Sequence, residues 1–412
     1  MTFTRKSADL TPIVDTVFSI VSKAKADKAA NGSEIVTDAT IGSLYGEDEK
    51  LVAYDTVFDH YDAIDHRSKA SYAASFTGNP DYRTDVWDWV TMGQALDIPH
   101  TVIATPGGSG AVSMAFTTFL DQGETAILPE IGWGSYTLMC HENNIEHISY
   151  HNFKDDHFDL TSLKEQIEKV KKMQDRIVIV LNDPCHNPTG YSLSDEEWSE
   201  LTDLLNDESK DVPIVLVNDI AYIDYANSTP EEARAYMQHF KELNENVLVE
   251  VCFSCSKTLT SYGLRCGAAV LLSKTQEAVR EAEIIMEKKA RATWSNIPNA
   301  AMKNFSWIVS EGRDAFMQEK QSYIDLMKER SDLFLNEAAD CDLPHYPYKE
   351  GFFVTVCTPD NAYRDRVHEA LMQEHIYTVK VNKGIRVAVC SLPLNKIKGL
   401  AAKMKSVMDR TK

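Results

Sequence analysis

Short apolar runs recur between residues 101 and 273, and segments with helix signals separate them. Runs of this length, rich in β-branched residues, are typical of strands buried on both faces of a parallel sheet. Several of them end in polar residues, so the pattern predicts a doubly wound α/β sheet with one active edge. The expected strands are 101–104, TAILP from Thr125, RIVIVLN from Arg176, PIVLVND from Pro213, the run from Val247 and 268–273.

Helix signals occupy the segments between and after these runs. Apolar residues at helical spacing predict a first helix, which Asn31 and Gly32 end. Two Ser-x-x-Glu sequences are interpreted as capping boxes. In the first part of the chain, the expected helices are this first one within 1–35, a helical region over about 52–77 that ends at FTGNPDY, and one from a glycine loop at 107–110 to about 120. The two capping boxes, Ser162 with Glu165 and Ser194 with Glu197, open further helices, the first of which extends to about 174. Two more are expected over 275–290 and 305–337.

The chain from residue 350 alternates short strands with helices. Its segments are GFFVTVCTP, a helix over 361–374, YTVKV, GIRVAVCSL and a last helix from Pro393. This alternation predicts a separate α+β domain that packs with the N-terminal segment. We therefore expect an N-terminal arm with part of the small domain (1–50), a large domain (51–320) and a C-terminal small domain (321–412).

Composition narrows the classes of function. The 412 residues are 43% hydrophobic, enough for a large core, and carry a formal net charge of −20. An acidic chain does not favour nucleic acid or anionic membranes as general partners. The N-terminus lacks the apolar segment of a signal peptide, and no apolar run reaches the length of about 18 residues that a membrane span needs. We expect a cytoplasmic protein.

The eight cysteines are scattered and mostly lie within apolar runs, which is typical of free buried thiols in a reducing compartment. Cys252 and Cys255 have the spacing of a redox or zinc motif. No second CxxC and no His-x-His pair accompanies them, and the two residues straddle the end of an expected strand. We predict no metal site.

The stretch 247–267, VLVEVCFSCSKTLTSYGLRCG, is the main candidate for a reactive site. An apolar strand ends near Ser254, Ser256 and Lys257, and Arg265 follows eight residues after the lysine. Lysine becomes a nucleophile near neutral pH when burial or a cationic neighbour lowers its pKa. The two hydroxyls and the guanidinium of Arg265 suit a dianionic phosphate. A lysine beside a phosphate site suggests pyridoxal 5'-phosphate as the cofactor.

Two other strand ends carry groups that suit the same cofactor. Gly107, Gly108 and Ser109 lie at a glycine-rich helix start, where backbone N–H groups bind anions. Asp219 ends the PIVLVND run, and a carboxylate there can pair with the pyridine nitrogen and keep it protonated. The phosphate and the ring nitrogen would then both have partners.

Further residues are candidates for contacts with the ring and the substrate. Asn187 and Tyr222 can hydrogen-bond the phenolic oxygen of the ring, and Trp133 can stack on its face. Gly42 and Gly46 would let the backbone approach a ligand, although simple turns are the more common explanation of each.

Eight motifs follow one another from residue 105 onward: TPGGSG, the tryptophan at 133, CHNPTG, NDIAY, SCSK, LRCG, RATWSN and GIRVAV, with DATIG before them. In this order they resemble the class I pyridoxal-phosphate-dependent aminotransferases of the aspartate/aromatic type. The resemblance implies type I fold architecture, with a mostly parallel seven-stranded large domain and a smaller α+β domain. It also implies a homodimer with shared active sites that transfers the amino group of an L-amino acid, aspartate or aromatic, to 2-oxoglutarate.

The resemblance assigns roles to single residues. Lys257 is implied to form a Schiff base with the cofactor and to move a proton, with Asp219 and Tyr222 as further catalytic residues. Arg386 is implied to bind the substrate α-carboxylate. Arg291 matches an arginine that reaches a substrate's side-chain carboxylate from the neighbouring subunit. Gly42, Trp133 and Asn187 are implied to line the substrate site.

Two positions call for comment against the family pattern. Tyr72 matches a phosphate ligand supplied by the other subunit, but its spacing to Gly78 is one residue longer than expected. Tyr136 stands where aspartate aminotransferases often have a histidine behind the aspartate that holds the ring nitrogen. We therefore expect the surroundings of Asp219 to differ from the family pattern.

Two other functions remain open at this point. A β-lyase on the same fold would share the lysine, aspartate and asparagine but has no need of Arg291, and it would release ammonia and pyruvate. A non-enzymatic regulator on this fold would need a DNA-binding extension, whereas about a hundred residues precede the glycine loop and the net charge is acidic.

Overall fold

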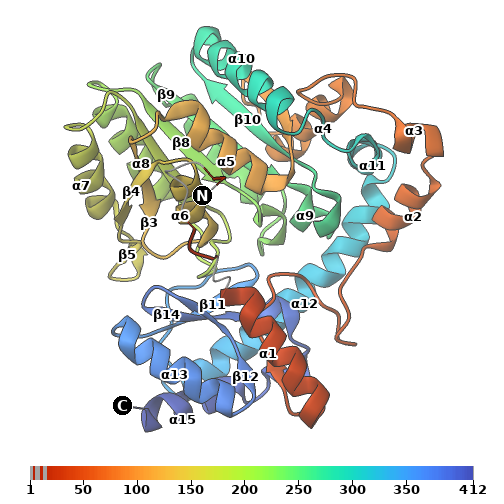
Figure 1. Ribbon diagram of the computed structural model, residues 1–412, viewed down its shortest axis with the longest axis vertical. Helices are drawn as coiled ribbons and strands as arrows, with labels where there is room; N and C mark the ends of the chain where they lie inside the picture. Colours follow the sequence, from red (N-terminus) through yellow and green to blue (C-terminus); the bar gives the residue numbers. More distant parts are fainter. Residues whose placement is uncertain (1–2, 5–9, 13–15, 412) are drawn as a thin grey trace.

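The computed structural model describes residues 3–4, 10–12 and 16–411. Its two larger sheets lie in different halves of the molecule (Figure 1). We call these the large-sheet half, above in Figure 1, and the small-sheet half, below. The predicted α/β sheet and the smaller α+β unit are both present.

The large sheet has seven strands in the order β2-β10-β9-β8-β7-β3-β4. β10 is antiparallel to both of its neighbours, and the other pairs are parallel. This arrangement confirms the predicted mostly parallel seven-stranded sheet. The strands are β2 His100–Thr105, β3 Thr125–Pro129, β4 Glu146–Tyr150, β7 Ile177–Asn182, β8 Ile214–Asp219, β9 Val247–Ser254 and β10 Gly267–Ser273.

Helices enclose this sheet on both faces. Every residue of β7, β8 and β9 is buried, and successive side chains of β9 alternate between two apolar layers. α5, α6 and α10 pack in one layer, and α4, α7, α8 and α11 in the other. The helices of this half are α2 Asp55–Ala63, α3 His66–Ala70, α4 Pro80–Thr91, α5 Gly107–Phe119, α6 Ser135–Glu142, α7 Leu160–Val170, α8 Asp195–Glu208, α9 Cys255–Thr258, α10 Gln276–Thr293 and α11 Asn299–Val309.

The small-sheet half is built from both ends of the chain. Its antiparallel sheet has the order β11-β14-β13, and β1 pairs in parallel with β12, so the N-terminal segment packs with the C-terminal one as predicted. Its strands are β1 Thr37–Asp38, β11 Phe353–Cys357, β12 Ile376–Tyr377, β13 Val379–Val381 and β14 Gly384–Ala388. Its helices are α1 Thr16–Asn31, α13 Asn361–Gln373, α14 Leu394–Ile397 and α15 Leu400–Arg410.

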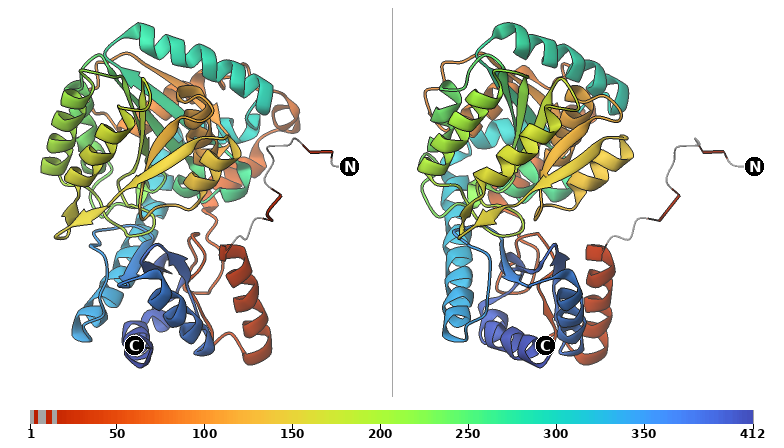
Figure 2. Two further views of the ribbon diagram at one scale, coloured as in Figure 1. Left: turned by 60° about the vertical axis from the view of Figure 1, so that its left-hand side comes forward. Right: turned by 90° about the vertical axis from the view of Figure 1, so that its left-hand side faces the viewer.

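The long helix α12, Arg313–Asp340, runs from one half into the other (Figure 2). Two buried cations fix it. Lys320 pairs with Asp224 of the large-sheet half at 3.4 Å, and Arg330 donates to the Cys390 carbonyl of the small-sheet half at 3.1 Å. The proposed boundary between the domains at residue 320 therefore falls within one continuous helix.

Several predicted helix starts were wrong. α7 begins at Leu160 rather than at a Ser162 capping box, because the Asp159 side chain accepts from the Ser162 N–H and the Ser162 hydroxyl accepts from the His151 N–H instead. The glycines predicted as a loop form the first turn of α5, which begins at Gly107. The capping box of Ser194 with its glutamate is confirmed.

The predicted helical region over 52–77 was also wrong in detail. It is divided into α2 and α3, because the Asp65 carboxylate accepts from two backbone N–H groups and starts α3. The helix α4 after it was not predicted, although Pro80 at its first turn is a recognised start signal.

The single helix predicted over 305–337 is two helices. α11 ends at Val309 and α12 begins at Arg313. The Trp307 ring packs directly on Gly312, between the two helices. A Cβ atom at this position would lie 2.4 Å from the ring, so only a residue without a side chain fits here. The last predicted helix is likewise divided, at Gly399, which has φ +79°.

All eight cysteines are free, and six of them are buried. In the part of the chain that the structure describes, no helix combines the length and the apolar composition that crossing a membrane requires. The same ranges contain no group of three or more His, Cys, Asp or Glu side chains arranged to hold a metal ion.

Glu250 is a carboxyl group inside the apolar interior. It lies in the middle of β9 and is fully buried; its Oε1 accepts from the Cys252 thiol at 3.7 Å, and its Oε2 has no hydrogen-bond partner among the described residues. Burial raises the pKa of Glu250 to about 8 from its ordinary value of 4.5. The folded protein therefore holds this group protonated at neutral pH.

We predict that Glu250 makes the protein less stable as pH rises from about 5 to 8. The unfolded chain releases this proton above pH 4.5 and the folded chain only near pH 8, so the folded state binds more protons between these values. Glu250→Gln removes the effect, and its stability advantage should grow by about 3 kcal/mol between pH 5.5 and 8. Apparent Tm values of both proteins at the two pH values test this. An advantage that does not change with pH would contradict a protonated Glu250.

Candidate active site

The amine of Lys257 lies at the carboxyl end of β9. Lys257 belongs to the short helix α9, and its Nζ donates to the Gly42 carbonyl at 2.6 Å. The rings of Tyr222 and Tyr262 lie 5.2 and 5.0 Å from this nitrogen. Burial, helped by the nearby Arg386, lowers the pKa of Lys257 to about 8, so a substantial fraction of the amine is neutral at mildly alkaline pH.

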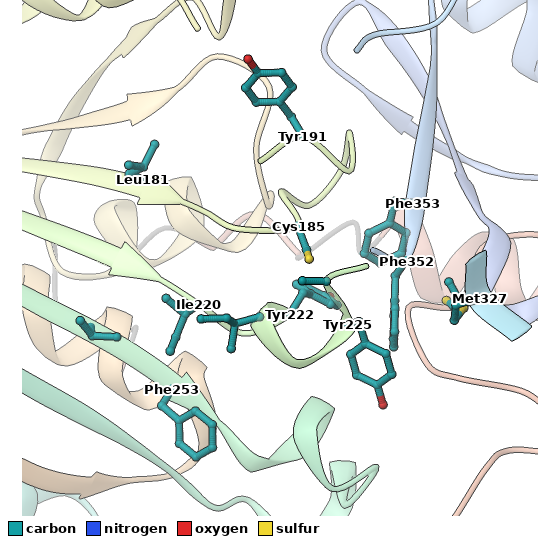
Figure 3. Packing of buried hydrophobic residues seen from close by; sticks show 14 of the residues in the cluster. Leu181, Cys185, Tyr191, Ile220, Tyr222, Tyr225, Phe253, Met327, Phe352 and Phe353 are labelled. Carbon is teal, nitrogen blue, oxygen red and sulfur yellow. The ribbon is translucent and has the colours of Figure 1, made fainter. Parts of the chain in front are cut away.

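A buried network fixes the backbone that carries this lysine. The Tyr225 hydroxyl donates to the Lys257 carbonyl at 3.0 Å, and the Thr258 hydroxyl donates to Asp224 at 2.6 Å. Tyr225 also packs on Phe352 with ring centroids 4.5 Å apart (Figure 3). The lysine thus stands on a rigid support.

Asp219 ends β8 and is buried beside this site. Its Oδ2 accepts from the Tyr136 hydroxyl at 2.6 Å, and its Oδ1 accepts from the Ala221 N–H at 3.1 Å. Burial raises the pKa of Asp219, and these two hydrogen bonds oppose the shift because they stabilise the ionised form. Trp133 lies next to Tyr136, edge to face, with ring centroids 5.4 Å apart.

A cluster of anion-binding groups forms where the first turn of α5 meets the ends of β9 and β10. Nη1 of Arg265 donates to the Ser256 hydroxyl at 3.1 Å, and its Nη2 donates to the Pro106 carbonyl at 3.1 Å. A Cβ atom at Gly107 would lie 2.7 Å from Nη2 of Arg265, so the glycine is required for this approach. The predicted phosphate ligands gathered here are Gly107, Gly108, Ser109, Ser254, Ser256 and Arg265.

Arg386 is a buried cation on β14 of the small-sheet half. Its Nη1 donates to Oδ1 of Asn187 at 3.1 Å, and its Nη2 donates to the Thr40 carbonyl at 2.9 Å. Its Nε is buried without a hydrogen-bond partner, and no carboxylate among the described residues pairs with the guanidinium. The guanidinium carbon Cζ of Arg386 lies 4.3 Å from the centre of the Phe353 ring. A buried charge of this kind needs an anion, which a ligand carboxylate would supply.

A cavity of about 1130 Å³ is lined by both Lys257 and Arg386. Asp219 and the anion-binding cluster do not line this cavity. The cavity lies between the two halves of the molecule, and its wall combines the amine, the guanidinium and aromatic side chains. The predicted site residues that line it are Gly42, Trp133, Asn187, Tyr222, Lys257 and Arg386.

Two contributors were missed by the sequence analysis. Tyr262 lies close to the lysine, and its hydroxyl accepts from the Leu44 N–H at 3.0 Å. Glu130 lies at the cavity wall and joins the two halves, accepting from the Asn382 side chain at 2.9 Å and from Lys383 at 3.0 Å. Glu130 directly follows the end of β3, and this position after a strand is the sequence signal from which it could have been predicted.

Two predicted residues lie away from the site within one chain. Tyr72 is 85% exposed. Arg291 is exposed too; it donates to the Ser295 hydroxyl at 2.6 Å and lies 4.8 Å from the centre of the Phe76 ring. Both therefore lie on the outer surface.

The observed groups fit pyridoxal 5'-phosphate. The buried amine, the buried carboxylate and the glycine-lined anion cluster are the partners that its carbonyl, ring nitrogen and phosphate require. A family model for the class I and II aminotransferases matches residues 42–404. The chain belongs to this family. The predicted resemblance, the enzyme class and the cofactor are thereby confirmed.

Individual relatives agree with this assignment. An aminotransferase from Anaerococcus prevotii has 35% sequence identity and a TM-score of 0.94, with 98% of this chain and 99% of that chain covered. The mitochondrial aspartate aminotransferase of Dictyostelium discoideum is 24% identical over 311 residues, 73% of this chain and 69% of the relative. An aromatic-amino-acid aminotransferase from Burkholderia pseudomallei, covalently bound to pyridoxal phosphate, shares the fold with a TM-score of 0.79, 20% identity and coverage of 98% and 99%.

We predict that this aminotransferase captures its cofactor with a rate that rises with pH and has its midpoint near pH 8, rather than near the 10.5 of an ordinary lysine. The neutral amine of Lys257 is the expected nucleophile, and burial would make it available at lower pH. Mixing cofactor-free protein with pyridoxal phosphate in a stopped-flow spectrometer between pH 6.5 and 9.5 tests this.

The control is Lys257→Ala. After borohydride reduction, mass spectrometry should find the cofactor's mass on the peptide with Lys257 in the wild type and on no peptide of the variant. A midpoint above pH 10, or labelling that persists in the variant, would show that another amine reacts.

Proposed function

We propose that this protein transfers the amino group between an L-amino acid, aspartate or aromatic, and 2-oxoglutarate, with Lys257 as the Schiff-base lysine. The observation that carries the proposal is the buried guanidinium of Arg386, which has no carboxylate partner among the described residues and lines the same cavity as the Lys257 amine. An α-amino acid offers a carboxylate, which would pair with the Arg386 guanidinium, and the amino group to be transferred, which would then lie near Lys257.

The cofactor would be held by residues of the large-sheet half. When bound, pyridoxal phosphate supplies an electron sink that stabilises negative charge at the substrate α-carbon. Asp219 would hold the proton on the ring nitrogen, and Asn187 and Tyr222 would hydrogen-bond the phenolic oxygen. Trp133 would cover one face of the ring. The phosphate would lie among Gly107, Gly108, Ser109, Ser254, Ser256 and Arg265.

Lys257 and Arg386 would then act on the substrate itself. Arg386 binds the α-carboxylate and so fixes the orientation of the α-hydrogen. The Lys257 amine would take up the α-proton and deliver it to the other end of the 1,3-proton transfer. A general base works best when its pKa lies near the working pH, and the pKa of about 8 meets that condition.

We further propose a homodimer in the cytoplasm, in which each subunit completes the cavity of the other. Tyr72 would contribute to the partner's phosphate site and Arg291 to its substrate side-chain site. The exposure of both residues in the single chain supports this proposal. The segment that carries Tyr72 is bound to the segment after Arg291, because Asn296 donates to the Ser75 carbonyl at 3.1 Å.

We predict different substrate patterns for the two arginines. Arg386→Ala should weaken every amino donor, since the loss of a charge-assisted bidentate pair at a desolvated site costs on the order of 2–5 kcal/mol. Arg291→Ala should lower kcat/KM by a similar amount for aspartate and glutamate only, because phenylalanine and tyrosine carry no second carboxylate. Single-turnover half-reactions test this, since 2-oxoglutarate as acceptor would lower the full cycle for every donor.

The control is Arg410→Ala, which removes an exposed arginine whose Nη1 lies 3.3 Å from Glu374 and should leave all half-reactions unchanged. Equal losses for aspartate and phenylalanine in Arg291→Ala would refute its side-chain role. Release of ammonia and pyruvate from a cysteine-like substrate, without transfer to 2-oxoglutarate, would refute the proposed reaction.

A further inference from the structure

Tyr136 joins the two groups that would surround the cofactor ring. It lies in the first turn of α6, its side chain is buried, and its hydroxyl donates to Oδ2 of Asp219 at 2.6 Å. The face-to-edge contact of its ring with Trp133 fixes the ring orientation. One side chain thus holds both the carboxylate and the aromatic neighbour in place.

The hydroxyl is the one side-chain donor to the Asp219 carboxylate in the described part of the chain. The other donor is the Ala221 N–H, on the opposite oxygen. The Asn182 side chain also bonds Asp219, but it donates to the backbone carbonyl, at 2.7 Å, and not to the carboxylate. The two hydrogen bonds favour the ionised form of the carboxylate and so offset part of the cost of burial, which on balance raises the pKa of Asp219.

A phenol is a donor that does not titrate near neutral pH. Burial, and then the negative charge of Asp219, raise the pKa of Tyr136 well above its ordinary value. The other titratable groups near Asp219 are Cys252 on β9, Tyr222 after β8 and Lys257 on α9. Burial raises the pKa of Cys252 well above its ordinary value, and that of Tyr222 also rises.

Lys257 is therefore the neighbour that would change its charge near neutrality, and the proposed function assigns it to the cofactor. Two buried carboxyls nearby also titrate in this range: Asp183, next to Asn182, has a pKa of about 7, and Glu250, whose Oε1 accepts from the Cys252 thiol, has a pKa of about 8. Neither of them is hydrogen-bonded to the Asp219 carboxylate in the described chain. The hydrogen bond from Tyr136 has the same strength throughout that range, because its donor stays protonated.

We propose that Tyr136 is a positioning residue that keeps the Asp219 carboxylate ionised and aimed at the ring nitrogen of the cofactor, with equal strength across the neutral pH range. Asp219 and the ring nitrogen compete for one proton. The hydrogen bond from Tyr136 stabilises the carboxylate and so leaves the proton on the ring. This inference rests on the proposed function, in which Asp219 pairs with that nitrogen.

The test compares Tyr136→Phe and Tyr136→His with the wild type, loaded with pyridoxal phosphate that carries ¹⁵N in the ring. The phenylalanine keeps the packing on Trp133 but removes the donor, whereas histidine is a donor that titrates near pH 6.5. Tyr363→Phe is the matched control, because its buried hydroxyl donates to the Met408 carbonyl at 2.7 Å in the small-sheet half.

The wild type and Tyr363→Phe should show a pyridinium ¹⁵N shift that is constant from pH 6 to 9. In Tyr136→Phe the shift should move toward that of a neutral pyridine, with kcat about 10- to 100-fold lower, as for a lost hydrogen bond to a charged group. In Tyr136→His both quantities should acquire an inflection between about pH 6 and 8.

An unchanged pyridinium shift in Tyr136→Phe would overturn the inference and leave the proposed function intact. If that variant no longer holds the cofactor, a pH-independent shift in Tyr136→His would overturn it instead. A wild-type protein that holds no cofactor at Lys257 would overturn the proposed function, and this inference with it.

Discussion

Neighbouring parallel strands keep their carboxyl ends together, and the site depends on that constraint. Asn182 and Asp219 are paired across β7 and β8, and Asp219 is paired with Cys252 of β9. The chain that leaves β7 carries Asn187, and the chain that leaves β9 carries Lys257. Groups far apart in the sequence therefore meet at one edge without long flexible loops, and the burial of the strands keeps the edge rigid.

Buried charges are treated in two different ways in this molecule. Asp224 receives two cations, Arg234 at 2.8 Å and Lys320 at 3.4 Å, and the pKa of its carboxyl is lowered because their charges outweigh the burial. Arg386 is also buried but has no carboxylate partner among the described residues. The charge of Asp224 is paired within the chain, and this pairing stabilises the fold. The charge of Arg386 has no anionic partner in the described chain, which costs stability and leaves the guanidinium available to an anionic ligand.

Local signals account for what the sequence predicted well. The apolar runs predicted the sheet, and the polar residues at their ends predicted that Lys257 and Asp219 lie at one edge. Helix boundaries were less predictable, because they depend on partners that only the fold brings near: Asp159 replaces Ser162 as the cap, and the Trp307 ring decides the break before α12. The role proposed for the exposed Arg291 concerns a second copy of the chain, so no contact within one chain could test it.

The groups that would hold the cofactor belong to the large-sheet half, whereas Arg386 belongs to the small-sheet half. The distance between the Lys257 amine and the Arg386 guanidinium therefore depends on the joint between the halves. That joint includes α12, about 42 Å long, and the polar contacts of Glu130. Substitutions along α12, which contributes no residue to the cavity wall, would therefore act on the spacing of these two groups without altering the cavity lining.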